Sequence, residues 1–135
     1  MFDPQLPMTT DADLLAMANE LVGVACRRQT WLLLLDEEQR VLTTALPVID
    51  GVPVDPDPED VAGFARMISG VVDRLEEARS TVLVWERPGS AEVRLLEADW
   101  IAGLAATTAP IRAQLIASDA GVHLVDPEFA ALTAG

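Results

Sequence analysis

Residues 30–35, with the sequence Thr-Trp-Leu-Leu-Leu-Leu, constrain the fold of this chain more than any other feature. The run is too short for an isolated helix, and it is bounded by the polar residues 36–39, as is typical of a strand. Because residues 32–35 are apolar at every position, a strand here has two apolar faces, whereas a strand with one face in water alternates. We therefore expect a strand inside a sheet that is covered by helices.

Three segments show helical patterns. Hydroxyl side chains at positions 9 and 10 can cap a helix that extends to about residue 25, and its apolar residues recur at helical spacing. Asp57 is a good N-cap and Pro58 suits the first position of a helix, whose apolar stripe continues to about residue 78. Residues 95–106 carry a third apolar stripe. We predict three helices.

The remaining apolar segments read as strands. Residues 40–46 are rich in β-branched side chains and are expected to form a hairpin with the first strand, and the Pro-rich segment 47–57 is expected to be a loop. Gly121 supplies the positive φ that a tight hairpin turn needs. The further predicted strands are 81–85, 113–117 and 122–125, with a turn at 88–90.

The resulting order is helix, two strands, helix, strand, helix, two strands, which predicts a three-layer α/β/α sandwich with a mixed central sheet. A chain of 135 residues, half of them hydrophobic, describes one domain over residues 1–135. A chain of this length buries roughly 65–70% of its unfolded surface, which is enough for stability without disulfides or a structural metal. Residues 1–8 and 127–135 are expected to be flexible or docking termini.

Charge excludes several classes of partner. The formal charge is −13, from 22 acidic residues against nine basic ones, all of them Arg. Binding to a phosphate backbone requires cations gathered on one surface, and anionic membranes would repel this chain, so we expect neither nucleic acid nor membrane partners. Without a long apolar run or a secretory signal pattern, the expected location is cytoplasmic.

Several short motifs together resemble a known family. A Leu-Leu-Asp strand end at 34–36 leads through a charged turn to Val-Leu at 41–42. The apolar strand 82–84 is followed by Trp-Glu-Arg-Pro-Gly-Ser at 85–90 and Leu-Glu-Ala-Asp at 96–99, and the closing hairpin covers 113–122. Over about residues 27–125 the chain resembles the RadC-like branch of the JAB (MPN) domain family. The resemblance implies a cytidine-deaminase-like architecture and, in the family, a zinc-dependent hydrolase site.

The residues that the family's zinc chemistry requires are mostly replaced. Such a site needs two imidazoles and a carboxylate on the metal, with an upstream Glu as base. Trp85 and Arg87 stand where the resemblance places the two histidines, and Arg28 or Gln29 stands near the Glu position. Only Asp99 matches a ligand, after a spacing one residue longer than in the family. Since His123 is the only histidine, we expect no metal, no cofactor and no catalytic residue of this type.

The first functional hypothesis is therefore a catalytically inactive JAB-like domain that acts as a protein-interaction or scaffold module, with a protein partner or as a homodimer. Its candidate binding residues are Trp31, Trp85, Glu86, Arg87 and Asp99, because aromatic and Arg side chains are common anchors at interfaces. These tryptophans could instead belong to the core, and Asp99 could be an exposed acid in the first turn of its helix.

The alternative is a sensor of a small anion or metabolite, or an unrecognised non-metal enzyme, that uses the former active-site cleft. Arg87 would bind the anionic group and Asp99 would orient it. A different fold, with an accidental family match, also remains open, and a sheet without 81–85 at its centre would expose it.

Overall fold

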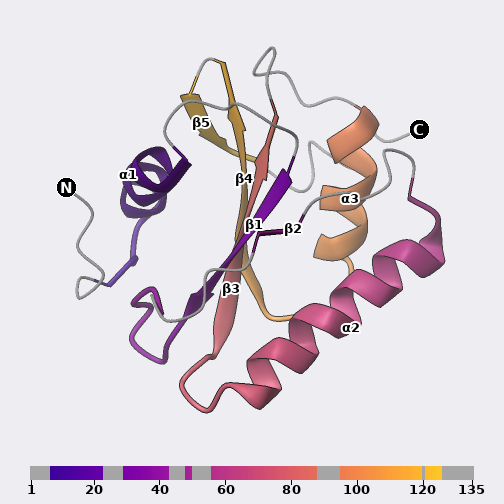
Figure 1. Cartoon of the computed structure of the whole chain (residues 1–135), viewed down its shortest axis with the longest axis horizontal. Helices are drawn as coiled ribbons and strands as arrows, with labels where there is room; N and C mark the ends of the chain where they lie inside the picture. The colour runs from indigo at the N-terminus through magenta and orange to yellow at the C-terminus, as the bar shows by residue number, and fades with distance from the viewer. Residues whose placement is uncertain are drawn as a thin grey trace.

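The computed structural model describes residues 7–22, 29–42, 48–49, 56–87, 95–119 and 121–125. Three helices and five strands lie in these ranges, and each helix is followed by one or two strands (Figure 1). In chain order they are α1 (Asp11–Val22), β1 (Gln29–Leu35), β2 (Val48–Ile49), α2 (Pro58–Arg74), β3 (Ser80–Glu86), α3 (Leu95–Ala105), β4 (Ile111–Ser118) and β5 (Gly121–Leu124).

The strands form one mixed sheet in the order β2-β1-β3-β4-β5, with β3 at its centre. β3 pairs with β4 in parallel and with β1 in antiparallel orientation, and both outer pairs are antiparallel. The parallel pair is joined through α3, as parallel neighbours require a crossover. The predicted mixed sheet is confirmed, and its central strand, β3, covers the predicted strand 81–85.

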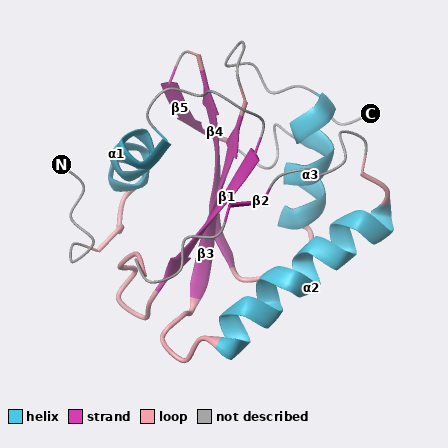
Figure 2. Ribbon diagram, in the orientation of Figure 1, coloured by secondary structure: helices cyan, strands magenta, loops and turns pink. Residues whose placement is uncertain are grey.

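Helices cover both faces of the sheet (Figure 2). α1 packs on one face, over β4 and β5, while α2 and α3 pack on the other. In β1 the buried leucines alternate between these two cores, since Leu33 and Leu35 belong to the α1 core and Leu32 and Leu34 to the opposite core. The apolar run 30–35 thus forms an interior strand with two buried faces, as predicted, and the layers are α/β/α.

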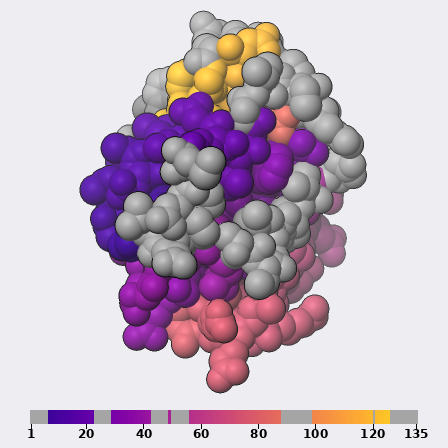
Figure 3. Space-filling view, turned by 60° about the vertical axis from the view of Figure 1, so that its left-hand side comes forward, coloured from indigo at the N-terminus to yellow at the C-terminus, as the bar shows by residue number. Residues whose placement is uncertain are grey.

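The surface reflects the same layering. In the space-filling view α1, coloured indigo, adjoins the β4–β5 hairpin, coloured yellow, and the α2–β3 end of the molecule lies at the opposite pole (Figure 3). No helix in the ranges that the structure describes is long and apolar enough to cross a membrane.

The start of α2 is fixed by its sequence. The side chain of Asp57 accepts a hydrogen bond from the backbone N–H of Asp60 at 2.8 Å, and the Asp60 carboxylate accepts one from the backbone N–H of Asp57 at 3.0 Å. This reciprocal capping box satisfies two helix-terminal donors, and Pro58 occupies the first turn, where no partner for its nitrogen is needed. The predicted helix start is confirmed.

The end of α2 corrects the prediction. The helix ends at Arg74 rather than near residue 78, and Leu75, expected on the buried stripe, is 36% exposed. Glu76 and Glu77 follow directly, and negative charges are unfavourable at the negative end of a helix dipole. Ala78 instead donates its backbone N–H to the carbonyl of Leu75, which turns the chain toward β3.

The first hairpin is confirmed in part, and the loop predicted after it is corrected. Val41 bridges to Leu35, which confirms the turn, while residues 43–46 of the predicted second strand lie outside the described residues. The predicted loop 47–57 contains a strand, β2, which pairs with β1 at Thr30 and Trp31. The two β-branched residues of β2 suit a strand despite the neighbouring Gly and Pro that favoured a loop. Of the predicted termini 1–8 and 127–135, residues 1–6 and 127–135 lie outside the described residues, as does the turn 88–90. Met8 is buried, and its backbone N–H donates to the carbonyl of Gln39.

The second hairpin and α3 agree with the sequence. β4 and β5 are antiparallel, and Gly121 has a φ of 104°, in the region that favours glycine. Trp100, Ile101 and Leu104 of α3 are buried in the core shared with α2. Gly103 allows these helices to approach, since a Cβ built there would lie 3.0 Å from Cγ1 of Val61.

Candidate functional site

The candidate site lies at the carboxyl end of β3, the central strand. After four apolar positions the strand ends in Glu86, and Arg87 follows it; their exposed fractions are only 2% and 6%. The backbone N–H of Arg87 donates to the carbonyl of Ala117 in β4 at 2.9 Å, which holds this end against the neighbouring strand. Two buried charged residues at the edge of a sheet require partners, because burial of an uncompensated charge is very costly.

Glu86 is tied to β1 through its carboxylate. Its Oε1 accepts a hydrogen bond from Nε2 of Gln29 at 2.7 Å and another from Nε1 of Trp31 at 2.8 Å. Gln29 is directly opposite Glu86 in the antiparallel ladder, and Trp31 is two residues farther along the same face of the strand. Strand pairing therefore places both neutral donors on one carboxylate oxygen.

Trp85 belongs to a second network on the opposite face of the sheet. Its indole Nε1 donates to Oε1 of Gln114 at 3.0 Å, and Nε2 of Gln114 donates to the backbone carbonyl of Ile101 at 3.1 Å. Trp85 also packs against Phe64 of α2 and Trp100 of α3, with ring centroids 6.1 and 5.9 Å away. This network joins β3, β4 and both helices of that layer.

The structure thus separates the predicted binding residues. Trp31 and Glu86 lie together on the α1 face, whereas Trp85 faces α2 and α3. The exposed fraction of Trp85 is 4%, because its ring fills the gap between the sheet and the two helices. Trp85 is therefore a core residue, and the hypothesis that it is an exposed binding residue is wrong. Trp100 is buried to a similar degree, so Trp31, which is half-buried, is the most accessible of the three tryptophans.

The remaining candidates are placed as follows. Asp99 is half-buried and is the fifth residue of α3, so it lies in the second turn rather than the first. His123 is exposed on β5, at the edge of the sheet, in agreement with its interpretation as a surface histidine. It pairs with Ile116 in the ladder.

Within the described ranges no group of three His, Cys, Asp or Glu side chains is placed to hold a metal ion. At the end of β3, Trp85 has no atom that coordinates a metal, and Arg87 is a permanent cation. Oε1 of Glu86 already accepts from two donors.

Sequence reasoning missed two glutamines that organise this region. Gln29 completes the Glu86 cluster, and Gln114 links Trp85 to α3. Gln114 is 3% exposed within an otherwise apolar strand run, and a polar side chain in such a run is a signal for a buried hydrogen-bond network. Gln29 was named only as one of two residues near the position of the family's Glu, and nothing in the sequence pointed to its bond with Glu86.

The fold and site define an α/β domain with a mixed sheet and a buried polar cluster at the end of its central strand. Comparisons with protein-family models, with curated proteins and with solved structures found no match for this chain.

Proposed function

We propose that this chain is a RadC-like JAB domain that has lost its metal chemistry and acts as a protein-interaction or scaffold module. The element order and the central position of β3 support the proposed architecture. The observation that carries the functional proposal is the double hydrogen bond to Oε1 of Glu86, because it uses the polar end of β3 to join β1 and β3. Trp85, which stands at one of the two histidine positions of the family, is bonded to Gln114 and contributes to the core.

In this proposal the partner contacts the accessible side chains around Glu86, which are those of Trp31 and Gln29. Trp31 and Gln29 are both half-buried, and Nε1 of Trp31 and Nε2 of Gln29 donate to Glu86. A partially exposed, rigidly held indole presents apolar area with little loss of side-chain entropy on binding, as hot-spot residues do. The partner is a second copy of the chain or another protein.

Light scattering over a range of concentrations, combined with hydrogen exchange on the full chain, tests this proposal. We expect a defined assembly, either of the chain alone or with an added partner, and slower amide exchange around residues 29–31 when it forms. The exposed segment 73–77, at the end of α2 and in the turn after it, is the internal control and should keep its exchange rate. A monomer at every concentration with no partner-dependent protection at 29–31 would contradict the proposal.

The alternative is a sensor of a small anion, and one observation favours it. Arg87 lies buried immediately after the carboxyl end of β3, beside the parallel strand β4, and open α/β sheets bind ligands outside the carboxyl ends of their strands. An Arg guanidinium matches carboxylate and phosphate groups in geometry as well as in charge.

A thermal-shift screen of anionic metabolites separates the two functions. A ligand present at about 100 times its dissociation constant adds roughly 2.7 kcal/mol to the free energy of unfolding. Saturable stabilisation that disappears in an Arg87→Gln variant would favour the sensor, while Arg112→Gln, a change of an exposed arginine, serves as the matched control.

A further inference from the structure

A groove lies away from the β3 site, at the edge of the sheet beside the first half of β4. It encloses about 610 Å³, a volume within the usual range of binding pockets, which is roughly 300–1,000 Å³. The β4–β5 ladder covers only Leu115–Ser118 of β4, so β5 leaves residues 111–113 without a neighbour on its side in the described part of the chain. The groove follows this open stretch of the edge.

Arg112 enters the groove at an irregular point of β4. In the parallel ladder with β3, Thr81 pairs with Ile111. The next residue of β3, Val82, pairs with Ala113, so Arg112 is an extra residue in β4. Ile111 contacts the core under α2 and α3, whereas Ala113 contacts the α1 core, although residues two apart in a regular strand share a face. Bulges of this kind redirect side chains and are common beside active sites.

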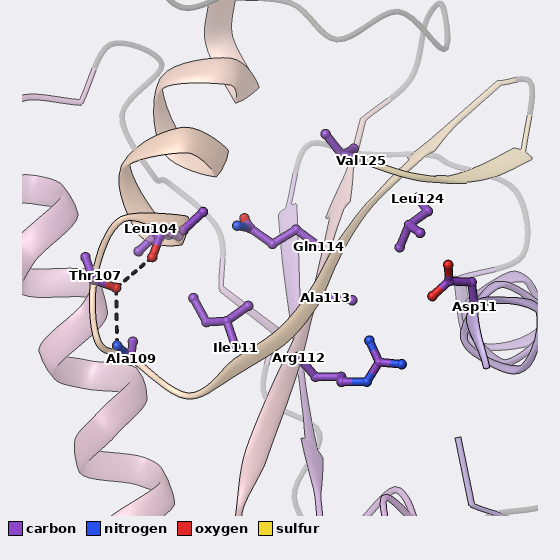
Figure 4. A pocket seen from close by; sticks show the side chains of 11 residues that line it. Asp11, Leu104, Thr107, Ala109, Ile111, Arg112, Ala113, Gln114, Leu124 and Val125 are labelled. Atoms are coloured by element: carbon purple, nitrogen blue, oxygen red, sulfur yellow. Dashed lines mark hydrogen bonds between the residues drawn. The ribbon is translucent and has the colours of Figure 1, made fainter. Parts of the chain in front are cut away.

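A contact with the turn after β1 positions the side chain of Arg112. Its Nε donates to Oε1 of Gln39 at 3.3 Å, across 73 positions of sequence. The two terminal nitrogens of the guanidinium are not used in this bond, and in Figure 4 the guanidinium lies on the same side of β4 as Asp11 and Leu124. An Arg guanidinium binds a carboxylate through two parallel hydrogen bonds, so Arg112 favours a ligand that carries a carboxylate.

A charge of opposite sign lines the same groove. Asp11 is the first residue of α1, and its side chain is exposed, as is that of Arg112. Within the described ranges Asp11 and Arg112 form no ion pair with each other. Two opposite charges that line one groove without pairing match a ligand that carries both a negative and a positive group.

The α3 side of the groove offers mainly apolar contact. Leu104 and Ile111 lie on this side (Figure 4). The hydroxyl of Thr107 donates to the carbonyl of Leu104 at 2.7 Å and accepts from the backbone N–H of Ala109 at 3.3 Å (Figure 4). The amide group of Gln114 is bonded within the core through both its oxygen and its nitrogen. The polar groups of this wall are therefore already bonded to the protein.

We propose that this groove binds a free amino acid with an apolar side chain. The carboxylate of the amino acid contacts the guanidinium of Arg112, and its ammonium group contacts the carboxylate of Asp11. Its side chain covers Leu124, which at 38% exposure is one of two exposed large apolar side chains in the described part of the chain, and reaches the wall formed by Leu104 and Ile111. Because both charged side chains are exposed, solvent and salt weaken their contacts, and we expect weak binding with rapid exchange.

An NMR titration of the isotope-labelled full chain with L-leucine tests the proposal. We expect saturable shifts of the backbone signals of Arg112, Ala113 and Leu124. Three related probes separate the contacts: isocaproate lacks the ammonium group, leucinamide lacks the carboxylate, and glycine lacks the apolar side chain. Each of these probes should bind at least about tenfold more weakly than leucine, which corresponds to about 1.4 kcal/mol.

Two variants of exposed side chains assign the charged contacts. Arg112→Gln and Asp11→Asn should each weaken the binding of leucine about tenfold. Arg74→Gln and Asp73→Asn, exposed at the end of α2, are the matched controls and should bind leucine as the wild type does. The absence of saturable shifts with leucine, or equal affinity for any of the three probes, would overturn the proposal. Unchanged leucine binding in either Arg112→Gln or Asp11→Asn would overturn it as well.

Discussion

The indole Nε1 of Trp31 donates to Oε1 of Glu86 across the β1–β3 ladder at 2.8 Å, and Gln29 donates to the same oxygen. This relationship connects two residues that are 55 positions apart in the sequence. The two neutral donors satisfy a buried carboxylate at the end of the central strand. Their bonds also stabilise the register of β1 against β3.

Replacement of Glu86 tests the importance of this contact. Glu86→Ala removes the shared acceptor and leaves an indole N–H and an amide N–H without it, so we expect the free energy of unfolding to fall by about 2–3 kcal/mol. Chemical denaturation measures the change. Glu76→Ala, at an exposed glutamate after α2, should lie within about 0.5 kcal/mol of wild type, and equal effects at both positions would contradict the assignment.

Gln114 should be as sensitive as an apolar core residue. Gln114→Leu keeps an apolar side chain in the strand but leaves Nε1 of Trp85 and the carbonyl of Ile101 without their partner, at a cost of about 2–3 kcal/mol in unfolding free energy. Arg112→Leu, two residues earlier and exposed, is the matched control. A stable Gln114→Leu variant would show that the network contributes little.

Two glycines in helices should respond to alanine in opposite ways. A Cβ at Gly70 of α2 would have no neighbour within 4 Å, so Gly70→Ala should add about 1 kcal/mol through helix propensity. At Gly103 the Cβ would press on Val61, and overpacking of about 1–3 kcal/mol should cancel or reverse that gain. Thermal unfolding of both variants measures the difference, and Val61→Ala in the Gly103→Ala background should restore stability.

The turn before Val41 contains a residue in the left-handed region. Gln39 has a φ of 63°, and its backbone carbonyl accepts from the N–H of Met8 at 2.7 Å, a bond that glycine can also make. Gln39→Gly should therefore raise the free energy of unfolding by about 0.5–1 kcal/mol. Glu37→Gly in the same turn should lower the free energy of unfolding slightly. A loss of stability in Gln39→Gly would show that the backbone of Gln39 is not strained.

The first turn of α1 makes a prediction about pH. The hydroxyl of Thr10, and then its backbone N–H, hold the pKa of Asp13 below its ordinary value. Because the folded pKa is the lower one, the stabilising contribution is complete above the unfolded pKa and is lost as pH falls through the folded pKa. Thr10→Ala should raise the pKa of Asp13 in an NMR titration of its carboxyl carbon, and Thr9→Ala, at a longer contact of 3.4 Å, should raise it less.

Apolar patterns predicted the layers of this fold well. The run 30–35 required burial on both faces of β1, and the capping residues at Asp57 and Pro58 placed the start of α2. The strand β2 was missed because it depends on tertiary pairing: it is a strand through its bonds to Thr30 and Trp31, in a segment whose own composition favours a loop. The end of α2 was missed because the apolar stripe continues past Arg74, while Glu76 and Glu77 disfavour helix there.

The sequence predicted where the candidate site lies but not which side chains contact one another there. The sequence pointed to the end of β3, yet consecutive residues of a strand face opposite sides of the sheet, so Trp85 and Glu86 belong to different networks. Their partners Gln114 and Gln29 come from the neighbouring strands β4 and β1. Which strands are neighbours is a property of the sheet order and cannot be read from spacing along the chain.

The most direct test of the account is the zinc content of untagged protein after incubation with excess zinc and desalting, measured with its mass by light scattering on the same sample. Under the proposed function, with Trp85 and Arg87 in place of imidazoles, the chain should retain far less than one zinc per chain and show the mass of a defined assembly. One tightly held zinc per chain would contradict the claim that this scaffold has lost its metal chemistry.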